Sequence, residues 1–179
     1  MRGISNMWYV VQVTTGHEVD MVKQSKERVI KEGEDVFVIK AEKNHRIKGE
    51  WVIREYLLFP SYIFFETDDP ADLRIRLRCI PEMTKILKTG DEFVPLYPEE
   101  EEHLRKLGGD KHYASYSEGI IVGDKLQVLD GAMKGFEGNV KKIDRHHRTA
   151  IIEVQLMGRP IEVELGLGVI KKITDDEAK

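Results

Sequence analysis

The chain of 179 residues contains a single cysteine, Cys79, and this scarcity limits the chemistry that it can support. One cysteine cannot form an internal disulfide or anchor a zinc site that is built on several cysteines. No Ser/His/Asp arrangement, glycine-rich phosphate loop or pair of carboxylates stands out. We therefore expect neither an enzyme nor a bound cofactor, and we expect Cys79 to be a buried or half-buried small side chain.

Long apolar runs are also missing, because no stretch approaches the roughly 18 residues of a membrane span. The first residues turn polar too soon for a signal peptide. Hydrophobic residues make up 41% of the chain and charged residues 34%, which favours a folded core with a solvated surface. These features predict a cytoplasmic monomer that does not contact membranes.

A global excess of positive charge is absent, since the formal net charge is −4, and this argues against a globally basic nucleic-acid binder. The charge is nevertheless uneven: residues 111–173 hold ten Lys or Arg against eight Asp or Glu, whereas residues 1–110 hold 17 against 21. The stretch between the two parts has no helical or strand period. We predict a first domain over 1–110, a flexible linker over 111–119, a second domain over 120–174 and a disordered tail over 175–179.

The first part alternates strand and helix patterns, and the segment 40–54 is charged enough to be a protruding hairpin or a mobile loop. Asp69 followed by Pro70, and later Pro98, are typical of helix starts. The predicted strands are 8–13, 36–39, 62–66 and 83–88, and the predicted helices are 16–32, one from Pro70, and one from Pro98 to Gly108. This order favours an α+β sandwich with helices packed on a mostly antiparallel sheet.

The second part is rich in short strand patterns separated by turn residues, which predicts a small barrel. Val140 and Ile143 break the two-residue period and indicate a bulge. The predicted strands are 126–129, 136–144, 149–157, 161–165 and 169–173.

Four motifs in this chain resemble those of one family. The segment from Val122 through the Lys134–Val140 stretch resembles the KOW motif, and Gly158–Leu165 resembles the closing strands of the NusG C-terminal domain. Trp8–Val11, followed by Gly16-His17-Glu18, resembles the start of a NusG N-terminal domain, and Phe59–Phe65 resembles its FPGY-type segment. The motifs occur in the family's order, so the chain is similar to the NusG family of bacterial transcription elongation factors.

This resemblance implies an α+β N-terminal sandwich of the NusG type followed by an all-β, SH3-like, five-stranded KOW barrel. It also implies a non-enzymatic regulator whose N-terminal domain binds RNA polymerase while the KOW domain recruits a second partner. Binding of either partner then raises the effective concentration of the other partner near its own domain. Among NusG relatives the chain is most similar to LoaP-type specialised paralogs, which are processive antiterminators. The basic loop 141–148 and Met157, which replaces a Phe that docks a ribosomal protein in many NusG proteins, support that comparison.

The polymerase-binding residues are expected on the aromatic strand and on the helix that follows it. One face of that strand is predicted to be an exposed apolar patch, although a sheet covered on both faces would place all of these side chains in the core. The arginines on the helix are predicted to contact polymerase or non-template DNA, or else to form a solvated helix side. The predicted set is Phe59, Pro60, Tyr62, Phe64, Arg74 and Arg78.

The RNA-binding residues are expected in the loops of the KOW domain, with a structured RNA such as a leader hairpin as the partner. A solubilising hairpin tip is the alternative for the loop. The predicted set is Lys134, Lys141, Lys142, Arg145, His146, His147, Arg148 and Arg159. The two adjacent histidines point to opposite faces on an extended chain and have no third ligand nearby, so no metal site is expected.

Two other functions remain open from the sequence. A general NusG would couple polymerase to a termination factor or to the ribosome, and Met157 would then fill the apolar pocket of a protein partner. A ribosomal-type KOW protein would only bind RNA, but such a protein has no need of the segment Phe59–Phe65.

Overall fold

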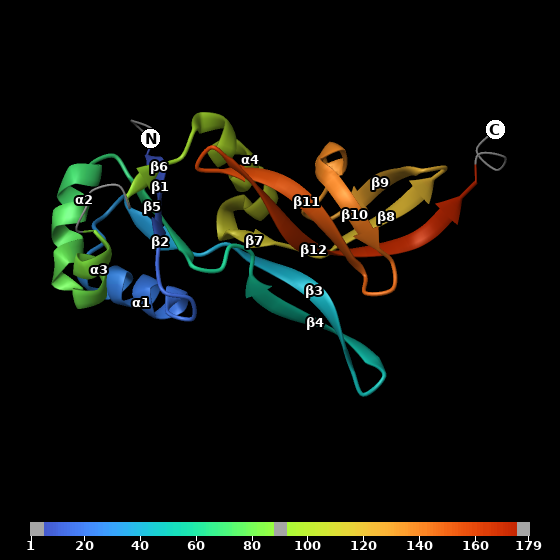
Figure 1. The fold of residues 1–179 in the computed structure, drawn as a ribbon, viewed down its shortest axis with the longest axis horizontal. Helices are drawn as coiled ribbons and strands as arrows, with labels where there is room; N and C mark the ends of the chain where they lie inside the picture. The colour runs from blue at the N-terminus through green and yellow to red at the C-terminus, as the bar shows by residue number, and fades with distance from the viewer. Residues whose placement is uncertain (1–5, 88–92, 175–179) are drawn as a thin grey trace. The chain divides into compact units, whose positions relative to one another are not determined.

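The structure, a computed structural model, describes residues 6–87 and 93–174 and divides into two compact units. The first unit holds the described residues of 1–38 and 59–101, and the second holds 39–58 with the described residues of 102–179. The segment 39–58 thus groups with the C-terminal residues (Figure 1). The domain boundaries predicted from the sequence stay a prediction, and the predicted tail lies outside the described residues.

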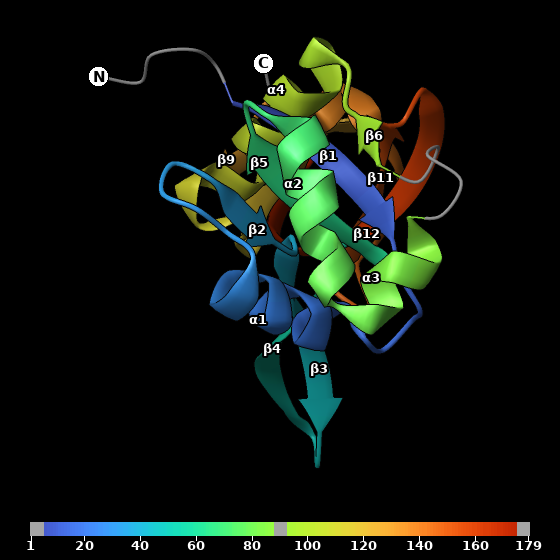
Figure 2. The same cartoon turned by 90° about the vertical axis from the view of Figure 1, so that its left-hand side faces the viewer.

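The first unit is a four-stranded sheet in the order β2-β5-β1-β6 with three helices. All of its recorded pairings are antiparallel, as the sequence predicts. Figure 2 shows the helices in front of this sheet. The elements are β1 (Met7–Gln12), α1 (Glu18–Arg28), β2 (Asp35–Phe37), β5 (Tyr62–Thr67), α2 (Pro70–Arg76), η1 (Leu77–Cys79), α3 (Pro81–Ile86) and β6 (Val94–Pro95).

The core of the first unit lies between the sheet and the helices. Val11 and Phe65 on neighbouring strands pack with Leu73 and Met83 from the helices, and all four are fully buried. Helix α2 begins as predicted, because the Asp69 carboxylate accepts a hydrogen bond from the Asp72 amide at 3.1 Å and Pro70 occupies the first turn.

Two predictions for this unit are wrong. Residues 83–86 belong to helix α3 rather than to a strand, because Pro81 sets the dihedral angle of a first helical turn and places Met83 in the core; Lys88, the last residue of the predicted strand, lies outside the described residues. Cys79 is exposed rather than buried: it ends the short turn η1, in which Leu77 is the buried residue.

The second unit contains a five-stranded sheet in the order β10-β11-β12-β8-β9 and a three-stranded sheet in the order β4-β3-β7. Among the described residues no pairing joins β9 to β10, so the structure shows the five strands without a closed barrel. Its elements are β3 (Lys40–Ile47), β4 (Glu50–Leu57), most of α4 (Pro98–Gly108), η2 (Gly109–Lys111), β7 (Tyr113–Ala114), β8 (Ser117–Val122), β9 (Lys125–Asp130), η3 (Glu137–Asn139), β10 (Val140–Asp144), β11 (Thr149–Leu156) and β12 (Arg159–Ile173).

Strand β12 joins the two segments that the sequence predicts as separate strands. Its first half pairs with β11 and its second half pairs in parallel with β8. Gly166 and Gly168 look like turn residues, but a Cβ there would lie 2.5 Å from the Tyr116 ring and 2.6 Å from its hydroxyl. These glycines therefore allow Tyr116 to lie directly against the strand. Regular structure (β7 and β8) extends into the range predicted as linker.

The bulge predicted in β10 is confirmed, because the pairing with β11 shifts between Val140 and Lys142. The strand itself is shorter than predicted, since residues 137–139 form the turn η3. No helix within the described ranges is long and apolar enough to span a membrane.

An ion-pair network ties helix α2 to the end of helix α1 and to the loop before β2. The Arg76 guanidinium donates to Glu34 and to Asp72, each at 2.7 Å, and to the Val29 carbonyl. Burial alone would raise the pKa of the Glu34 carboxyl, but hydrogen bonds, led by the one from Arg76, outweigh burial and hold the pKa below its ordinary value. Because the side chains of Arg76 and Glu34 are only 18% and 8% exposed, this pair is well shielded from solvent.

We predict that Arg76→Ala lowers the free energy of unfolding of the first unit by about 2 kcal/mol at pH 7, because it leaves the buried Glu34 carboxylate without its cation. A carboxyl whose pKa is lowered by folding stabilises above its unfolded pKa of about 4.3, and that stabilisation is lost as pH falls through the folded pKa. The difference between the two proteins should therefore shrink in acid. Urea unfolding can be followed through buried Trp8 in a Trp51→Phe background.

The matched control is Lys26→Ala, which removes an exposed ion pair with Asp35 in the same unit. Such a pair contributes about 0.5 kcal/mol or less, without the same acid dependence. An Arg76→Ala protein as stable as Lys26→Ala at pH 7 would contradict the prediction.

Candidate nucleic-acid interface

Strands β3 and β4 form a regular hairpin. For the charged segment 40–54, the predicted hairpin is therefore correct and the mobile loop is not. Ile47 pairs with Glu50, so that only Lys48 and Gly49 form the loop. Both have positive φ, 51° and 88°, as a tight two-residue turn between twisted strands requires.

Hydrogen bonds fix the base of this hairpin within the second unit. The Glu42 carboxylate accepts from the Tyr113 hydroxyl and from the Tyr116 amide, both at 2.8 Å. The Tyr56 hydroxyl donates to the Glu164 carbonyl on β12. Burial raises the pKa of the Tyr56 and Tyr113 hydroxyls well above the ordinary value, so both remain neutral donors.

The turn from β10 to β11 is closed by Asp144. Its carboxylate accepts from the His147 amide at 2.9 Å and lies 2.7 Å from the His147 Nδ1. These hydrogen bonds, the amide first, hold the pKa of Asp144 below its usual range, so the turn keeps a fixed negative group under its basic tip. Arg148 follows with a positive φ of 55°, and its guanidinium carbon lies 4.5 Å from the centre of the Trp51 ring on β4.

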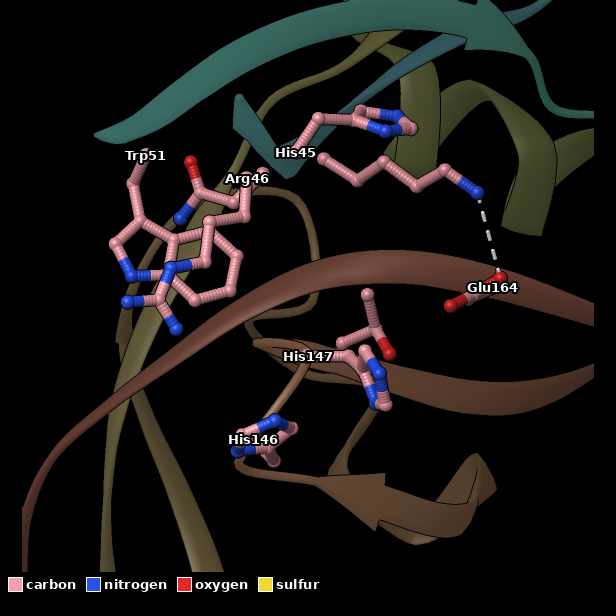
Figure 3. A pocket seen from close by; sticks show the side chains of 9 residues that line it. His45, Arg46, Trp51, His146, His147 and Glu164 are labelled. Carbon is pink, nitrogen blue, oxygen red and sulfur yellow. Dashed lines mark hydrogen bonds and ion pairs between the residues drawn. The ribbon is translucent and has the colours of Figure 1, made fainter. Parts of the chain in front are cut away.

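A cleft of about 360 Å³ lies between the hairpin and the β10–β11 turn (Figure 3). The hairpin side chains lie along one wall and the histidines of the turn along the other, as Figure 3 shows. The only acid in its lining, Glu164, is 3.4 Å from the Lys43 ammonium. The lining residues are Lys43, Asn44, His45, Arg46, Trp51, His146, His147, Thr149 and Glu164. The lining is therefore cationic around one large aromatic ring.

The predicted RNA-binding residues lie in three places: along β10 and the turn after it, in the loop after β9, and at the start of β12. Lys142, Arg145, His146 and His147 are exposed at the end of β10 and in the turn, whereas Arg148 is half-buried against Trp51.

Lys141 is exposed too, but its ammonium lies 3.4 Å from the Glu153 carboxylate across the strand pair. Lys134 is exposed in the loop after β9.

Arg159 does not belong to the same end of the sheet. It pairs with Leu156 at one end of β11, whereas the basic turn meets β11 at Thr149. Seven residues of strand separate the two ends, which is about 23 Å. Arg159 was predicted to bind RNA together with the residues of the basic turn, but strand pairing places it at the other end of β11, so it does not extend that surface.

Met157 lies beyond the end of β11, in the turn before β12, with a positive φ of 54°. The strand predicted over 149–157 thus ends one residue earlier, and the Met157 side chain is half-buried. Docking of a protein partner at Met157 stays a prediction.

The predicted polymerase-binding residues are mostly packed. Phe64 is fully buried and Phe59 is 4% exposed. Phe64 lies 5.9 Å from Phe59, 6.1 Å from Trp8 and 5.6 Å from Phe37 between ring centres. The predicted exposed apolar patch is therefore wrong for Phe59 and Phe64, and the covered-sheet alternative describes them.

The remaining residues of this set are more accessible. Pro60 is exposed and Tyr62 half-buried, at the start of β5. Arg74 is half-buried and donates to the Leu87 carbonyl at 2.7 Å, whereas Arg78 is exposed. Polymerase binding through these residues stays a prediction.

Sequence reasoning missed the hairpin's contribution to the basic cleft. Lys43, His45, Arg46 and Trp51 come from a segment about 100 residues before the turn that they face. The available signal was a tryptophan among basic residues in the segment 40–54, which is a combination common in nucleic-acid binding surfaces.

Within the described residues no group of three or more His, Cys, Asp or Glu side chains is placed to hold a metal ion. The rings of His146 and His147 are 5.1 Å apart and nearly perpendicular.

Comparison with known proteins gives the chain a family. Residues 6–105 match the profile of the family described as transcription termination factor NusG. The NusG protein of Thermus thermophilus, described as a transcription termination/antitermination protein, is 26% identical over 92% of this chain and 97% of its own length. The Bacillus subtilis protein of the same description is 27% identical, over 93% of this chain and 98% of its own length.

A solved structure concerned with domain interaction in Thermotoga maritima NusG covers 90% of this chain and 93% of its own, with a TM-score of 0.51 and 21% identity. This similarity supports the fold: a NusG-type N-terminal domain with a β-rich C-terminal domain. Because the family profile spans more than half of the sequence, and the relatives match over nearly their whole length, the chain belongs to the NusG family of transcription termination and antitermination factors.

Proposed function

We propose that this NusG-type factor acts as an antiterminator that binds RNA polymerase through its first unit and a structured RNA, a leader hairpin, through its second. Family membership supports the transcriptional role. The observation that carries the RNA part is the exposed basic tip formed by Lys142, Arg145, His146 and His147, in a chain whose net charge is −4. A solubilising tip would not need a cation on the facing hairpin as well, and Arg46 supplies one, while Lys43 offsets the charge of Glu164.

This surface suits a phosphate backbone more than a protein partner. Exposed Lys and Arg side chains gain from neutralising phosphates and releasing counterions. The regular major groove of an RNA helix is too deep and narrow for side chains to read, so recognition requires a shaped RNA with a loop or bulge. On the basis of this basic turn, we propose that the chain is a LoaP-type specialised paralog. We also propose that its five-stranded sheet closes into the SH3-like KOW barrel.

We predict that the double variant Lys142→Ala/Arg145→Ala binds an RNA hairpin about tenfold more weakly than the unchanged chain, because two phosphate contacts are lost. The slope of log affinity against log salt should fall by about two. The measurement is a titration of the full chain against fluorescently labelled hairpin RNA at several salt concentrations.

The charge-matched control is Arg159→Ala/Lys171→Ala, which removes two exposed cations away from the turn. This control should bind almost as tightly as the unchanged chain. Equal losses in both double variants would show that only net charge matters, and no RNA binding at moderate salt would favour a general NusG that couples polymerase to a termination factor or the ribosome.

We predict that Tyr62→Ala weakens binding to bacterial RNA polymerase by about 30-fold, since truncated aromatic anchors at interfaces commonly cost about 2 kcal/mol. Tyr62 is chosen because it is half-buried at the start of β5, whereas Phe64 is part of the core and its removal would unfold the unit. Binding can be measured by biolayer interferometry on immobilised polymerase.

Tyr97→Ala is the control for this variant, because Tyr97 is a 60% exposed aromatic residue of the same unit. If folded Tyr62→Ala protein binds polymerase as well as Tyr97→Ala protein does, Tyr62 is not part of the interface.

We also predict that the unchanged chain increases readthrough of a terminator placed after a hairpin-encoding leader, in transcription reactions with purified polymerase. The Lys142→Ala/Arg145→Ala protein should lose this increase and the Arg159→Ala/Lys171→Ala protein should keep it, because only the first pair lies at the basic tip. Increased termination by the unchanged chain would overturn antitermination as the function.

A further inference from the structure

The cleft beside the basic tip has a composition that phosphate binding alone does not explain. One of its lining side chains is Trp51, a large aromatic residue that is half-exposed on β4. Two arginines lie against this ring: the guanidinium carbon of Arg148 is 4.5 Å from the ring centre and that of Arg46 is 6.0 Å away. We propose that this cleft binds one unpaired nucleotide of the RNA, with its base stacked on Trp51.

The first argument is the spacing of the planar groups. A cation–π contact is favourable when the cation lies within about 6 Å of the ring centre, so Arg148 is well inside this range and Arg46 is at its limit. The Arg46 Nε also donates a long hydrogen bond, of 3.4 Å, to the Gly49 carbonyl, so Arg46 is held less firmly than Arg148. The loose Arg46 can give way to a base and then lie on its other face. Aromatic rings and arginine planes are the two surfaces on which proteins stack unpaired RNA bases.

The second argument is the charge around the ring. A stacked nucleotide carries its phosphate into the cleft, where the imidazoles of His146 and His147 lie on the wall opposite the hairpin (Figure 3). The one acid, Glu164, has its charge offset by Lys43 at 3.4 Å. The cleft volume of about 360 Å³ is near the lower end of the range for small-ligand sites, which fits a single nucleotide.

The third argument is that both walls are held in place. The Asp144 carboxylate fixes the His147 side of the turn, and Glu42 fixes the base of the hairpin through the Tyr113 hydroxyl and the Tyr116 amide. Apart from Arg46, which moves aside, the cleft does not have to be ordered when it binds, so that less of the stacking energy is lost.

This inference rests on the proposed RNA binding and assigns a different task to a different set of residues. The exposed lysine and arginine of the tip contact the backbone of the RNA, and Trp51 holds an unpaired base beside the stem. Stacking tolerates any base, so the cleft distinguishes a looped RNA from a fully paired one and does not read sequence.

The test compares two RNA probes with the full chain: a hairpin with an unpaired loop and a blunt duplex of the same stem. Trp51→Ala should weaken hairpin binding roughly tenfold, leave the salt slope unchanged because no charge is lost, and leave duplex binding unchanged. The fluorescence of Trp51 should be quenched by the hairpin and not by the duplex, while Trp8, which is 0% exposed, keeps its emission.

The control is Ile53→Ala, which truncates a 52% exposed apolar side chain two residues along the same strand and should bind both probes normally. Trp51→Phe keeps an aromatic face, so it should retain most of the affinity, and it gives a result even if Trp51→Ala does not fold. Hairpin binding by Trp51→Ala at full strength, or unquenched Trp51 in the complex, would overturn the cleft proposal while RNA binding itself stands. Equal quenching by a DNA hairpin of the same sequence would overturn the assignment to RNA, whereas a failure of the unchanged chain to bind either RNA would overturn the proposed function itself.

Discussion

The close approach of Tyr116 to strand β12 is the constraint on which the second unit depends. Gly166 and Gly168 have no side chain because the Tyr116 ring and hydroxyl occupy that space. Tyr116 is also held by Glu42, whose carboxylate accepts a hydrogen bond from the Tyr116 amide. The missing side chain of Gly166 leaves room for the Glu42 carbonyl as well. One strand, one tyrosine and one hairpin therefore share a single packing arrangement, and a methyl group at Gly166 would disturb all three.

The basic cleft is a consequence of this arrangement. The hairpin lies against β12 through Glu42 and Tyr56, and this brings Trp51 under Arg148 at the end of the β10–β11 turn. Charges that look unremarkable along the sequence thus accumulate on facing walls. The acid that could cancel them, Glu164, is engaged by Lys43, so a protein with a net charge of −4 presents a locally cationic surface.

Local patterns in the sequence predicted local structure well. Asp69-Pro70 marked the start of α2, and the broken alternation at Val140 marked the bulge, because both effects depend on residues close in the chain. The strand predicted over 83–88 missed a local signal, Pro81, but the other main errors arose because the relevant partner lies far away in the sequence. Gly166 and Gly168 resemble a turn unless Tyr116 is known to lie beside them, and no strand period reveals that Arg159 and the basic turn are at opposite ends of β11. Trp51 was passed over for the same reason, because its meaning comes from Arg148 and His146 about 100 residues later.

The second unit is built from two separate segments of the chain, and this affects how it folds during synthesis on the ribosome. The hairpin ends at Leu57, but the strand that supports it, β12, ends at Ile173, more than 100 residues later. At a ribosomal rate of about 5–20 residues per second, the hairpin waits roughly 5–20 seconds for its partner. During that interval the outer edges of the hairpin have no neighbouring strand, and such edges attract other chains when they are apolar. The dense Lys, Arg and Glu side chains of β3 and β4 therefore protect the nascent chain from aggregation before they take part in the finished cleft.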